Sequence, residues 1–267
     1  MPTLTRDDGT TLTYVTYGDA LTQATPIVFL NGMTQTTLSW KTQARAMQSE
    51  FPIITYDARG QGESEVGDKS LELELHADDL AALLDELGVK RAHLVGFSHG
   101  ARVALAFANH HPERLDHLVL CSATARPTAL ARTIIRGWRE ILAAGGLEAM
   151  SWASLTSILG KDYLEQNEKL IPGIIRASVQ RNQLEGVTRL LDAMLDYPDL
   201  ADLARGVRAP TLVIYGEQDL LVDAEGAREL ATLSSGESLR VDGVGHTVPI
   251  EAPEVFRESL RDFLPAS

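Results

Sequence analysis

The sequence is poor in cysteine and in positive charge. Its 267 residues include one cysteine, so no disulfide can form within the chain. Cys121 stands in an apolar run, and we expect a small buried core thiol there rather than a nucleophile. Lys and Arg number 24 against 37 for Asp and Glu, which gives a formal net charge of −13. Because such a surface repels phosphate backbones and anionic lipid, we expect no nucleic-acid partner and no membrane partner.

The sequence also lacks the patterns of export, membrane insertion and metal or phosphate binding. Residues 1–8 show no charged segment leading into an apolar one, and no apolar run approaches the length of a membrane span. The expected location is the cytoplasm. No spacing of His, Asp and Glu resembles a zinc or di-metal site, so neither a metal nor a cofactor is predicted. The loop 57–64 is rich in glycine but has no Gly-Lys-Ser/Thr, which argues against a phosphate cradle. Asp57 and Arg59 are instead expected to lock this loop.

What the sequence does contain is a regular alternation of strands and helices. Hydrophobic residues make up 44% and charged residues 23%, as in an ordinary globular protein with a core. This alternation indicates an α/β fold: a mostly parallel central sheet of about eight strands, flanked by helices, with an antiparallel start. The predicted strands are residues 1–5, 11–17, 26–30, 53–56, 93–97, 115–120, 210–215 and 238–241. A helix over 253–264 closes the chain.

About ninety residues separate the strands predicted at 115–120 and 210–215, and they show helical periodicity without a convincing strand. So long a segment is predicted to be an inserted helical cap over 123–207, with residues 1–122 and 208–267 forming the core. Glycines and prolines are expected to divide the cap into four or five helices. They stand at positions 145–146, 160, 172–173 and 198.

The first cap helix has two faces of opposite character. The apolar face, predicted to pack on the core or line a pocket, consists of Ile134, Trp138, Ile141 and Leu142. Trp138 is therefore a candidate substrate-binding residue. The basic stripe consists of Arg132, Arg136 and Arg139, with Arg126 just before the helix. This stripe either faces solvent, which is the favoured interpretation, or overhangs the pocket and attracts anionic substrates.

The pentapeptide Gly96-Phe97-Ser98-His99-Gly100 fits the pattern Gly-x-Ser-x-Gly, where a buried strand runs straight into a helix. A turn this sharp strains the serine backbone, and the residues two positions away must lack side chains to avoid collision. The turn presents the Ser98 hydroxyl at the carboxyl edge of the sheet. The N–H groups of the following helix favour a developing oxyanion there. Ser98 is the predicted nucleophile.

These motifs together resemble the α/β-hydrolase superfamily over essentially the whole chain. The matching features are the loop 30–33, the Asp-x-Arg-Gly-x-Gly-x-Ser loop at 57–64, the elbow around Ser98 and the cap. The resemblance implies that the catalytic acid and then the catalytic histidine follow the nucleophile along the chain.

His246 is the histidine that follows the late strands, in a glycine-rich loop, and is the implied base. Asp219 matches the superfamily's acid position, with Glu217 and Asp223 as alternatives. Most of the other histidines are expected at the surface or at helix ends. They are His76, His93, His99, His110, His111 and His117.

The resemblance also implies an oxyanion hole built from the backbone N–H groups of Met33 and His99. The sequence departs from the commoner His-Gly pair by carrying Asn31, a candidate substrate-binding residue. The side chain of His99 either lines the pocket or packs. Arg102 matches an arginine that binds substrate carboxylate in the cyclohexadiene-carboxylate synthases of menaquinone synthesis, although a solvated helix arginine is the favoured interpretation.

Three functions remain open from the sequence. The first is a cofactor-independent serine hydrolase that cleaves a carboxylic ester, thioester or lactone through an acyl-enzyme on Ser98. The second uses the same three residues as a general base in a lyase reaction on a carboxylate substrate. The third is a weakly catalytic ligand receptor, since folds of this kind also serve as binding modules. The expected partner is a small acyl substrate, and the sequence leaves monomer and homodimer open.

Overall fold

The computed structural model describes residues 1–18, 21 and 23–265. Its centre is an eight-stranded sheet in the order β1-β2-β4-β3-β5-β6-β7-β8. The strands are β1 (Thr3–Thr5), β2 (Thr11–Tyr17), β3 (Ile27–Leu30), β4 (Ile53–Tyr56), β5 (Ala92–Phe97), β6 (Leu115–Cys121), β7 (Thr211–Gly216) and β8 (Glu237–Val241). Strands β3 to β8 are parallel, whereas β1 and β2 add an antiparallel edge. The predicted α/β fold with a mostly parallel sheet is confirmed.

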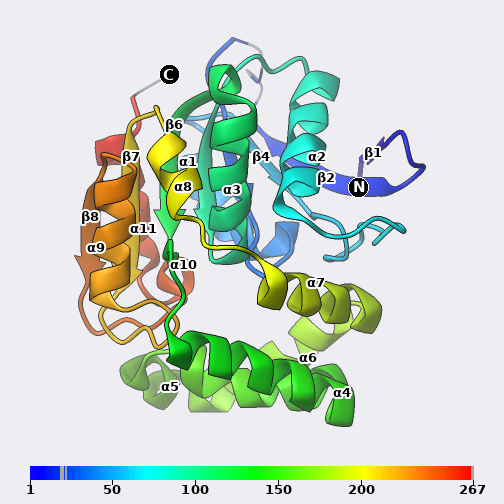
Figure 1. Cartoon of the computed structure of the whole chain (residues 1–267), viewed down its shortest axis with the longest axis vertical. Coiled ribbons are helices and arrows are strands. Elements are labelled where there is room, and N and C mark those ends of the chain that lie inside the picture. The colour runs from blue at the N-terminus through cyan, green and yellow to red at the C-terminus, as the bar shows by residue number, and fades with distance from the viewer. Residues whose placement is uncertain (19–20, 22, 266–267) are drawn as a thin grey trace.

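Helices cover both faces of this sheet (Figure 1). The helices outside the β6–β7 connection are η1 (Thr37–Trp40), α1 (Lys41–Met47), α2 (Leu73–Glu86), α3 (His99–His110), η2 (Pro112–Arg114), α9 (Ala224–Leu233), α10 (Val248–Glu251) and α11 (Pro253–Phe263). One buried cluster joins the sheet to α2, α3 and α9, and a second joins it to α1, α10 and α11.

Strand β3 shows why the sequences of the inner strands are continuous apolar runs. Ile27 and Phe29 belong to one buried cluster, and Val28 and Leu30 belong to the other. Successive side chains of a strand point to opposite faces, and both faces here are covered by helices. Each position of β3 must therefore be apolar.

Every regular element of the connection from β6 to β7 is a helix. The connection contains α4 (Ala129–Ile158), α5 (Lys161–Asn167), η3 (Glu168–Leu170), α6 (Ile171–Arg181), α7 (Leu184–Asp196) and α8 (Ala201–Gly206). Helices α4 to α7 form a layer of their own at the lower end of Figure 1, with α4 against α6 and α7. Helix α8 instead packs on α3 and α9 of the sheet layer.

One expected helix break inside this connection falls differently. Pro172 lies in the first turn of α6 and does not separate two helices, because the N–H that proline lacks has no partner there anyway. The break between α6 and α7 falls instead at Asn182, whose backbone is extended. Neither Asn182 nor the next residue, Gln183, is a glycine or a proline. Gly146 does interrupt α4, with φ 74° and ψ −172°.

The apolar face of α4 differs in one position from its prediction. Ile135, Trp138 and Leu142 are buried, whereas Ile141 is exposed. The buried stripe of the first part of α4 runs through Ala131, Ile135, Trp138 and Leu142, and Ile141 lies just outside it.

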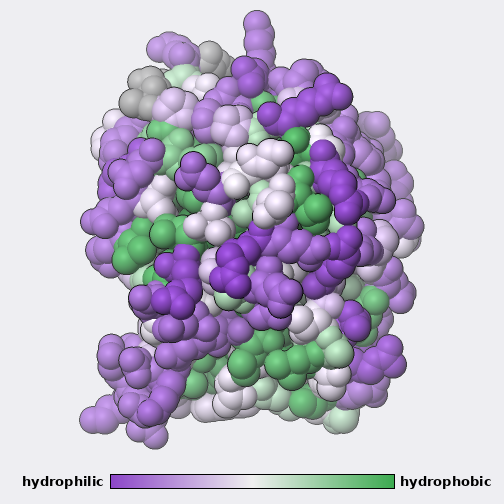
Figure 2. Space-filling model, turned by 60° about the vertical axis from the view of Figure 1, so that its left-hand side comes forward, coloured by the Kyte–Doolittle hydropathy of each residue, from purple (hydrophilic) through white to green (hydrophobic). Residues whose placement is uncertain are grey.

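Figure 2 shows one face of the molecule, on which hydrophilic side chains predominate and hydrophobic ones gather near its lower end, at the height of the α4–α7 layer. In the described part of the chain, no helix combines the length and the apolar character that a membrane span requires.

Candidate active site

Ser98 occupies a strained turn between β5 and α3. Its φ of 52° and ψ of −111° lie in a region that residues other than glycine rarely adopt. The turn is possible because the residues two positions before and after Ser98 are glycines without a Cβ. A Cβ on Gly96 would clash with the Cα of Ala101 at 2.5 Å, and one on Gly100 would clash with the carbonyl oxygen of Leu30 at 2.4 Å. The two glycines let α3 begin directly against β5 and β3.

Ser98, His246 and Asp219 lie in one hydrogen-bonded row. The Oγ of Ser98 is 2.9 Å from Nε2 of His246, and Nδ1 of the same ring is 2.7 Å from Oδ2 of Asp219. Both His246 and Asp219 are buried. The three residues that sequence order selects are thus brought together from the loops after β5, β7 and β8.

Backbone donors fix the carboxylate of Asp219. Its Oδ1 accepts hydrogen bonds from the N–H groups of Leu221 (2.8 Å) and Val222 (3.1 Å), which leaves Oδ2 for the imidazole. An Asp held in this way orients the ring and stabilises an imidazolium. The two alternative acids are engaged elsewhere, since Glu217 accepts from the N–H of Gly243 and Asp223 caps α9.

The loop of His246 is held by residues that sequence reasoning missed. The hydroxyl of Ser122 donates to the His246 carbonyl at 2.6 Å, and the His246 N–H donates to the carbonyl of Ile158, at the end of α4. Ser122, like Ser98, has a positive φ, of 54°, just past the end of its strand. The strained turn after β6 is what aims its hydroxyl at this loop.

Glu251 fastens the same loop from α10. Its Oε2 accepts from the N–H groups of Gly245 (3.0 Å) and Gly160 (2.7 Å), and its Oε1 accepts from the N–H and the hydroxyl of Thr247. Gly160 belongs to the turn between α4 and α5. One carboxylate therefore ties the His246 loop to the inserted helices.

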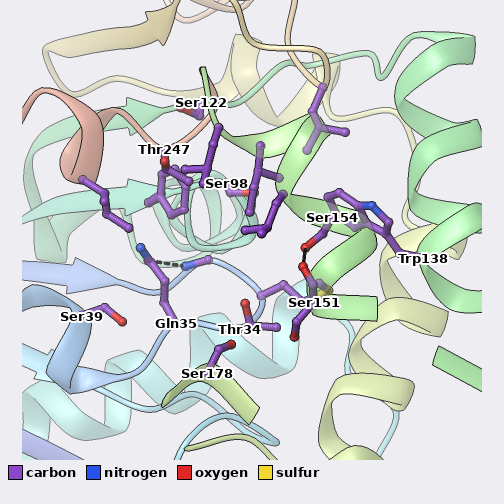
Figure 3. Close-up of a pocket in the computed structure, with 18 of the residues that line it drawn as sticks. Thr34, Gln35, Ser39, Ser98, Ser122, Trp138, Ser151, Ser154, Ser178 and Thr247 are labelled. Carbon is purple, nitrogen blue, oxygen red and sulfur yellow. Dashed lines mark hydrogen bonds between the residues drawn. The ribbon is translucent and has the colours of Figure 1, made fainter. Parts of the chain in front are cut away.

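A cavity of about 380 Å³ opens in front of Ser98 (Figure 3). Figure 3 shows Thr34, Gln35 and Ser39 on one side and Ser151, Ser154 and Trp138 of α4 on the other. The apolar part of the lining includes Met33, Phe97, Ile135, Met150, Leu155, Ile175, Met194 and Leu221. The inserted helices supply much of this wall.

The residues predicted to form the oxyanion hole, Met33 and His99, can be located in the structure. Met33 lines the cavity beside Ser98, and His99 opens α3, so its N–H is one of those that a helix leaves free. Within the described residues no hydrogen bond occupies either N–H. The side chain of His99 does not line the cavity but packs inward, with Nε2 3.1 Å from the hydroxyl of Tyr197, which in turn donates to the carbonyl of Leu71.

A family model described as the alpha/beta hydrolase fold matches residues 25–253. The chain belongs to the α/β-hydrolase family.

Among curated proteins, this α/β hydrolase is 29% identical over 254 residues to "Putative carbamate hydrolase RutD" of Pantoea ananatis (strain LMG 20103), covering 94% of this chain and 92% of that one. It is 29% identical over 249 residues to "Putative 2-succinyl-6-hydroxy-2,4-cyclohexadiene-1-carboxylate synthase" of Bacillus subtilis (strain 168), covering 89% of each. Among solved structures, the enol-lactonase from Burkholderia xenovorans LB400 matches with a TM-score of 0.89 at 28% identity, over 98% of this chain and 99% of that one.

Of the three predicted substrate-binding residues in this α/β hydrolase, two line the cavity. Trp138 and Arg102 do so. Asn31 does not, and its prediction was wrong: its amide is buried, donates to the carbonyl of Tyr56 and accepts from the indole N–H of Trp40. The polar atoms of the Asn31 side chain form hydrogen bonds that hold the loop after β3 in place.

Arg102 is a cation without a partner. Within the described residues its guanidinium has neither a hydrogen-bond acceptor nor an acidic neighbour that forms an ion pair. Burial lowers the pKa of Arg102, and the neighbouring Tyr197 opposes this shift. Arg181, at the exposed end of α6, also lines the cavity, and no Asp or Glu stands among the described lining residues.

The basic stripe of α4 faces away from the cavity, so the interpretation that it overhangs the mouth was wrong. None of Arg126, Arg132, Arg136 and Arg139 lines the cavity. Arg126 pairs with Asp199 and Glu229, and Arg139 pairs with Asp192. These pairs keep the basic charge on the outer surface.

The remaining predictions about single groups can be followed in the structure. Arg59 is buried between Asp79 (2.6 Å) and Asp8 (2.8 Å), and Asp57 accepts from the N–H of Thr37, so both lock their loop as expected. Cys121 is a buried core residue, and burial raises the pKa of its thiol to about 12. A thiol with that pKa does not supply a thiolate nucleophile.

Proposed function

We propose that this chain is a serine hydrolase that cleaves a carboxylic ester, thioester or lactone through an acyl-enzyme on Ser98. The observation that carries the proposal is the row Ser98–His246–Asp219, with distances of 2.9 and 2.7 Å, at the wall of the cavity. A serine that hydrogen-bonds a base, which is itself oriented by a buried carboxylate, is an activated nucleophile.

In this mechanism His246 takes the proton of Ser98 as the oxygen attacks the substrate carbonyl. The oxyanion that forms accepts hydrogen bonds from the N–H groups of Met33 and His99, and the N-terminus of α3 favours its charge. His246 then gives its proton to the leaving group. A water molecule, activated in the same way, releases the acyl group from Ser98.

The cavity favours a small to medium-sized acyl group with an apolar body. Its volume of about 380 Å³ lies at the lower end of small-molecule sites. The likeness to an enol-lactonase at 28% identity supports an ester-type carbonyl, and the likeness to a carbamate hydrolase at 29% identity adds carbamates to the compounds worth testing.

The test is turnover of p-nitrophenyl esters, acyl thioesters, enol lactones and carbamates, combined with labelling by a serine-directed phosphonate. Ser98→Ala is expected to lose about 10⁶-fold in kcat and all of the label. Asp219→Asn and His246→Ala are each expected to lose orders of magnitude. Their double variant is expected to be little worse, because the residues act as a unit. Full turnover by Ser98→Ala would overturn the proposal.

A second candidate is a lyase in which the same three residues act as a base toward a carboxylate substrate. The specific observation behind it is Arg102, an unpartnered cation in the lining. The relative named for a cyclohexadiene-carboxylate synthase, at 29% identity, agrees with a carboxylate-bearing substrate.

The anionic substrate is tested with a neutral butyrate ester and a hemisuccinate ester of one alcohol. If Arg102 binds a carboxylate, kcat/KM favours the hemisuccinate at low salt and the preference shrinks as salt rises. Arg102→Met erases the preference and spares the butyrate. The control Arg136→Glu, on the outer face of α4, leaves it unchanged. Equal kcat/KM for both esters in the wild type would remove Arg102 from substrate binding.

A further inference from the structure

A second cluster of polar side chains lies at the edge of the sheet opposite Ser98. It consists of His93, near the start of β5, and Asp116 and His117, near the start of β6. Five residues at about 3.3 Å each separate His93 from Ser98 along the strand, or roughly 16 Å. The cluster is therefore separate from the proposed active site.

An irregularity in the sheet brings the cluster together. The register between β5 and β6 shifts here, so that the single residue His93 stands opposite two residues, Asp116 and His117. Consecutive strand residues normally point to opposite faces, but a bulge re-aims one of them. Asp116 and His117 can thus both turn toward His93.

The donor atoms have the spacing of a metal site. Oδ2 of Asp116 lies 2.9 Å from Nδ1 of His117 and 3.4 Å from Nδ1 of His93. The three ligand atoms lie within 4.8 Å of one another. In a tetrahedral zinc site with bonds of 2.0–2.1 Å, neighbouring ligand atoms stand about 3.3 Å apart. The two separations from Asp116 Oδ2 lie within a few tenths of an ångström of this value.

The Nδ1 atom of His93 is the strongest sign of a missing ligand. The His93 side chain is 1% exposed, and this nitrogen has no hydrogen-bond partner. Buried polar atoms without a partner are rare and call for an explanation, one of which is an ion. Asp116 and His117 are about one-fifth exposed, which gives an ion access from solvent.

The surroundings hold the ligands in place. Arg91 pairs with the other carboxylate oxygen of Asp116, Oδ1, at 3.0 Å, which leaves Oδ2 turned to the histidines. The ring of Phe51 meets His93 edge-on, and Phe263, at the end of α11, meets His117 in the same way. Such outer contacts orient metal ligands and lower the cost of ordering them.

We propose that His93 Nδ1, Asp116 Oδ2 and His117 Nδ1 bind one divalent transition-metal ion of the zinc class, with water as the fourth ligand. Two imidazoles and a carboxylate are ligands that suit zinc. On binding, the ion takes the place of the proton on His117 Nδ1 that faces Asp116, and that proton moves to Nε2, so both imidazoles bind as neutral rings protonated on Nε2. The site would join β5 to β6 and stands apart from Ser98.

The experiment uses the full chain, freed of metal with EDTA and dialysed, and ZnCl₂ as the probe. Titration calorimetry is expected to show one strong site per chain, and thermal unfolding is expected to shift upward with zinc. Co²⁺ in place of zinc is expected to give the intense visible absorption of a tetrahedral ion. His117→Gln and Asp116→Asn, both partly exposed, are each expected to weaken zinc binding by about tenfold or more.

The control is the double variant His110→Gln/His111→Gln, which removes two adjacent histidines outside the cluster. It keeps the strong site if the proposal is correct. Absence of a strong site in the wild-type chain, or a site that survives in His117→Gln and disappears in the control, overturns it. The proposal stands apart from the serine chemistry, since EDTA is expected to leave turnover by Ser98 unchanged.

Discussion

At the scale of single residues, the Glu251 carboxylate, which does not line the substrate cavity, holds the loop that carries the proposed catalytic base, His246. Glu251 collects four hydrogen bonds, two on each oxygen, from Gly160, Gly245 and Thr247. His246 lies between the last two. Its distance from Ser98 therefore depends on a group that approaches from behind the loop.

Glu251→Gln is expected to lower kcat by about tenfold with little change in KM, and to lower the free energy of unfolding by about 2 kcal/mol. The amide turns one acceptor into a donor, so two of the four N–H and O–H donors lose their partner. Steady-state kinetics and urea unfolding check both numbers. Glu254→Gln is the matched control, because Glu254 is exposed on α11 and pairs with Arg257. Equal behaviour of the two variants would refute the positioning role.

The sequence predicted the elbow well because its cause is local. Gly96 and Gly100 flank Ser98 at fixed spacing, and their contacts explain that spacing. Ser122 could not be found in this way, because it reaches His246 across 124 residues of sequence. Glu251 lies close to His246 in sequence, but its bond to Gly160 spans 91 residues and leaves no local pattern. The strain at Ser122 has no signature in the residues around it.

At the scale of elements, α4 supplies both a wall of the cavity and a support for the His246 loop. Trp138 and Ser154 of α4 line the cavity. The carbonyl of Ile158, at the end of α4, accepts a hydrogen bond from the N–H of His246. A movement of α4 thus alters the shape of the cavity and the position of the base together.

Trp138→Ala is expected to shift substrate preference toward bulkier acyl groups and to cost about 3–5 kcal/mol in the free energy of unfolding. Trp138 is 6% exposed and faces the cavity, so its removal enlarges the space there. The ratio of kcat/KM for octanoate and acetate esters measures the preference. Trp152→Ala, on the same helix but 45% exposed, is expected to leave both quantities near wild type. An unchanged ester ratio in Trp138→Ala would remove this helix from the site.

The strands could be predicted to within about two residues because apolar runs and turn residues mark them clearly. The helices of the β6–β7 connection were harder. Pro172 fits into the first turn of α6, and the true break at Asn182 is stabilised by tertiary contacts, with its amide donating to the carbonyl of Thr34. Breaks set by packing leave no local signal.

At the scale of the whole molecule, buried histidines make stability depend on pH. His76 is fully buried, and neither of its ring nitrogens has a hydrogen-bond partner. Burial lowers the pKa of His76 from 6.5 to about 4, with Asp79 opposing the shift and Arg59 adding to it. Burial also lowers the pKa of His99, which His76 and Arg102 depress further.

The free energy of unfolding is expected to fall as the pH drops from 6.5 to 4. In this window the unfolded chain binds a proton on His76 and the folded chain does not, so acid favours unfolding. The contribution of this residue is on the order of 3 kcal/mol. Urea unfolding of the wild type and His76→Leu at several pH values measures it, with His110→Gln as an exposed control. A pH slope in His76→Leu as steep as in the wild type would rule out His76 as the cause.

The route of the chain into and out of the α4–α7 layer has a practical consequence. The chain leaves the sheet after β6 and returns to the neighbouring strand β7, so the layer begins and ends over adjacent strands. An exchange of residues 129–196 for the equivalent helices of another family member would keep every strand and the elbow intact. The graft must preserve two hydrogen-bond sites, the carbonyl at position 158 and the N–H at position 160. If both hydrogen-bond sites are kept, a library of such grafts would vary the specificity for the acyl group. Ser98, His246 and Asp219 would be the same in every member of the library.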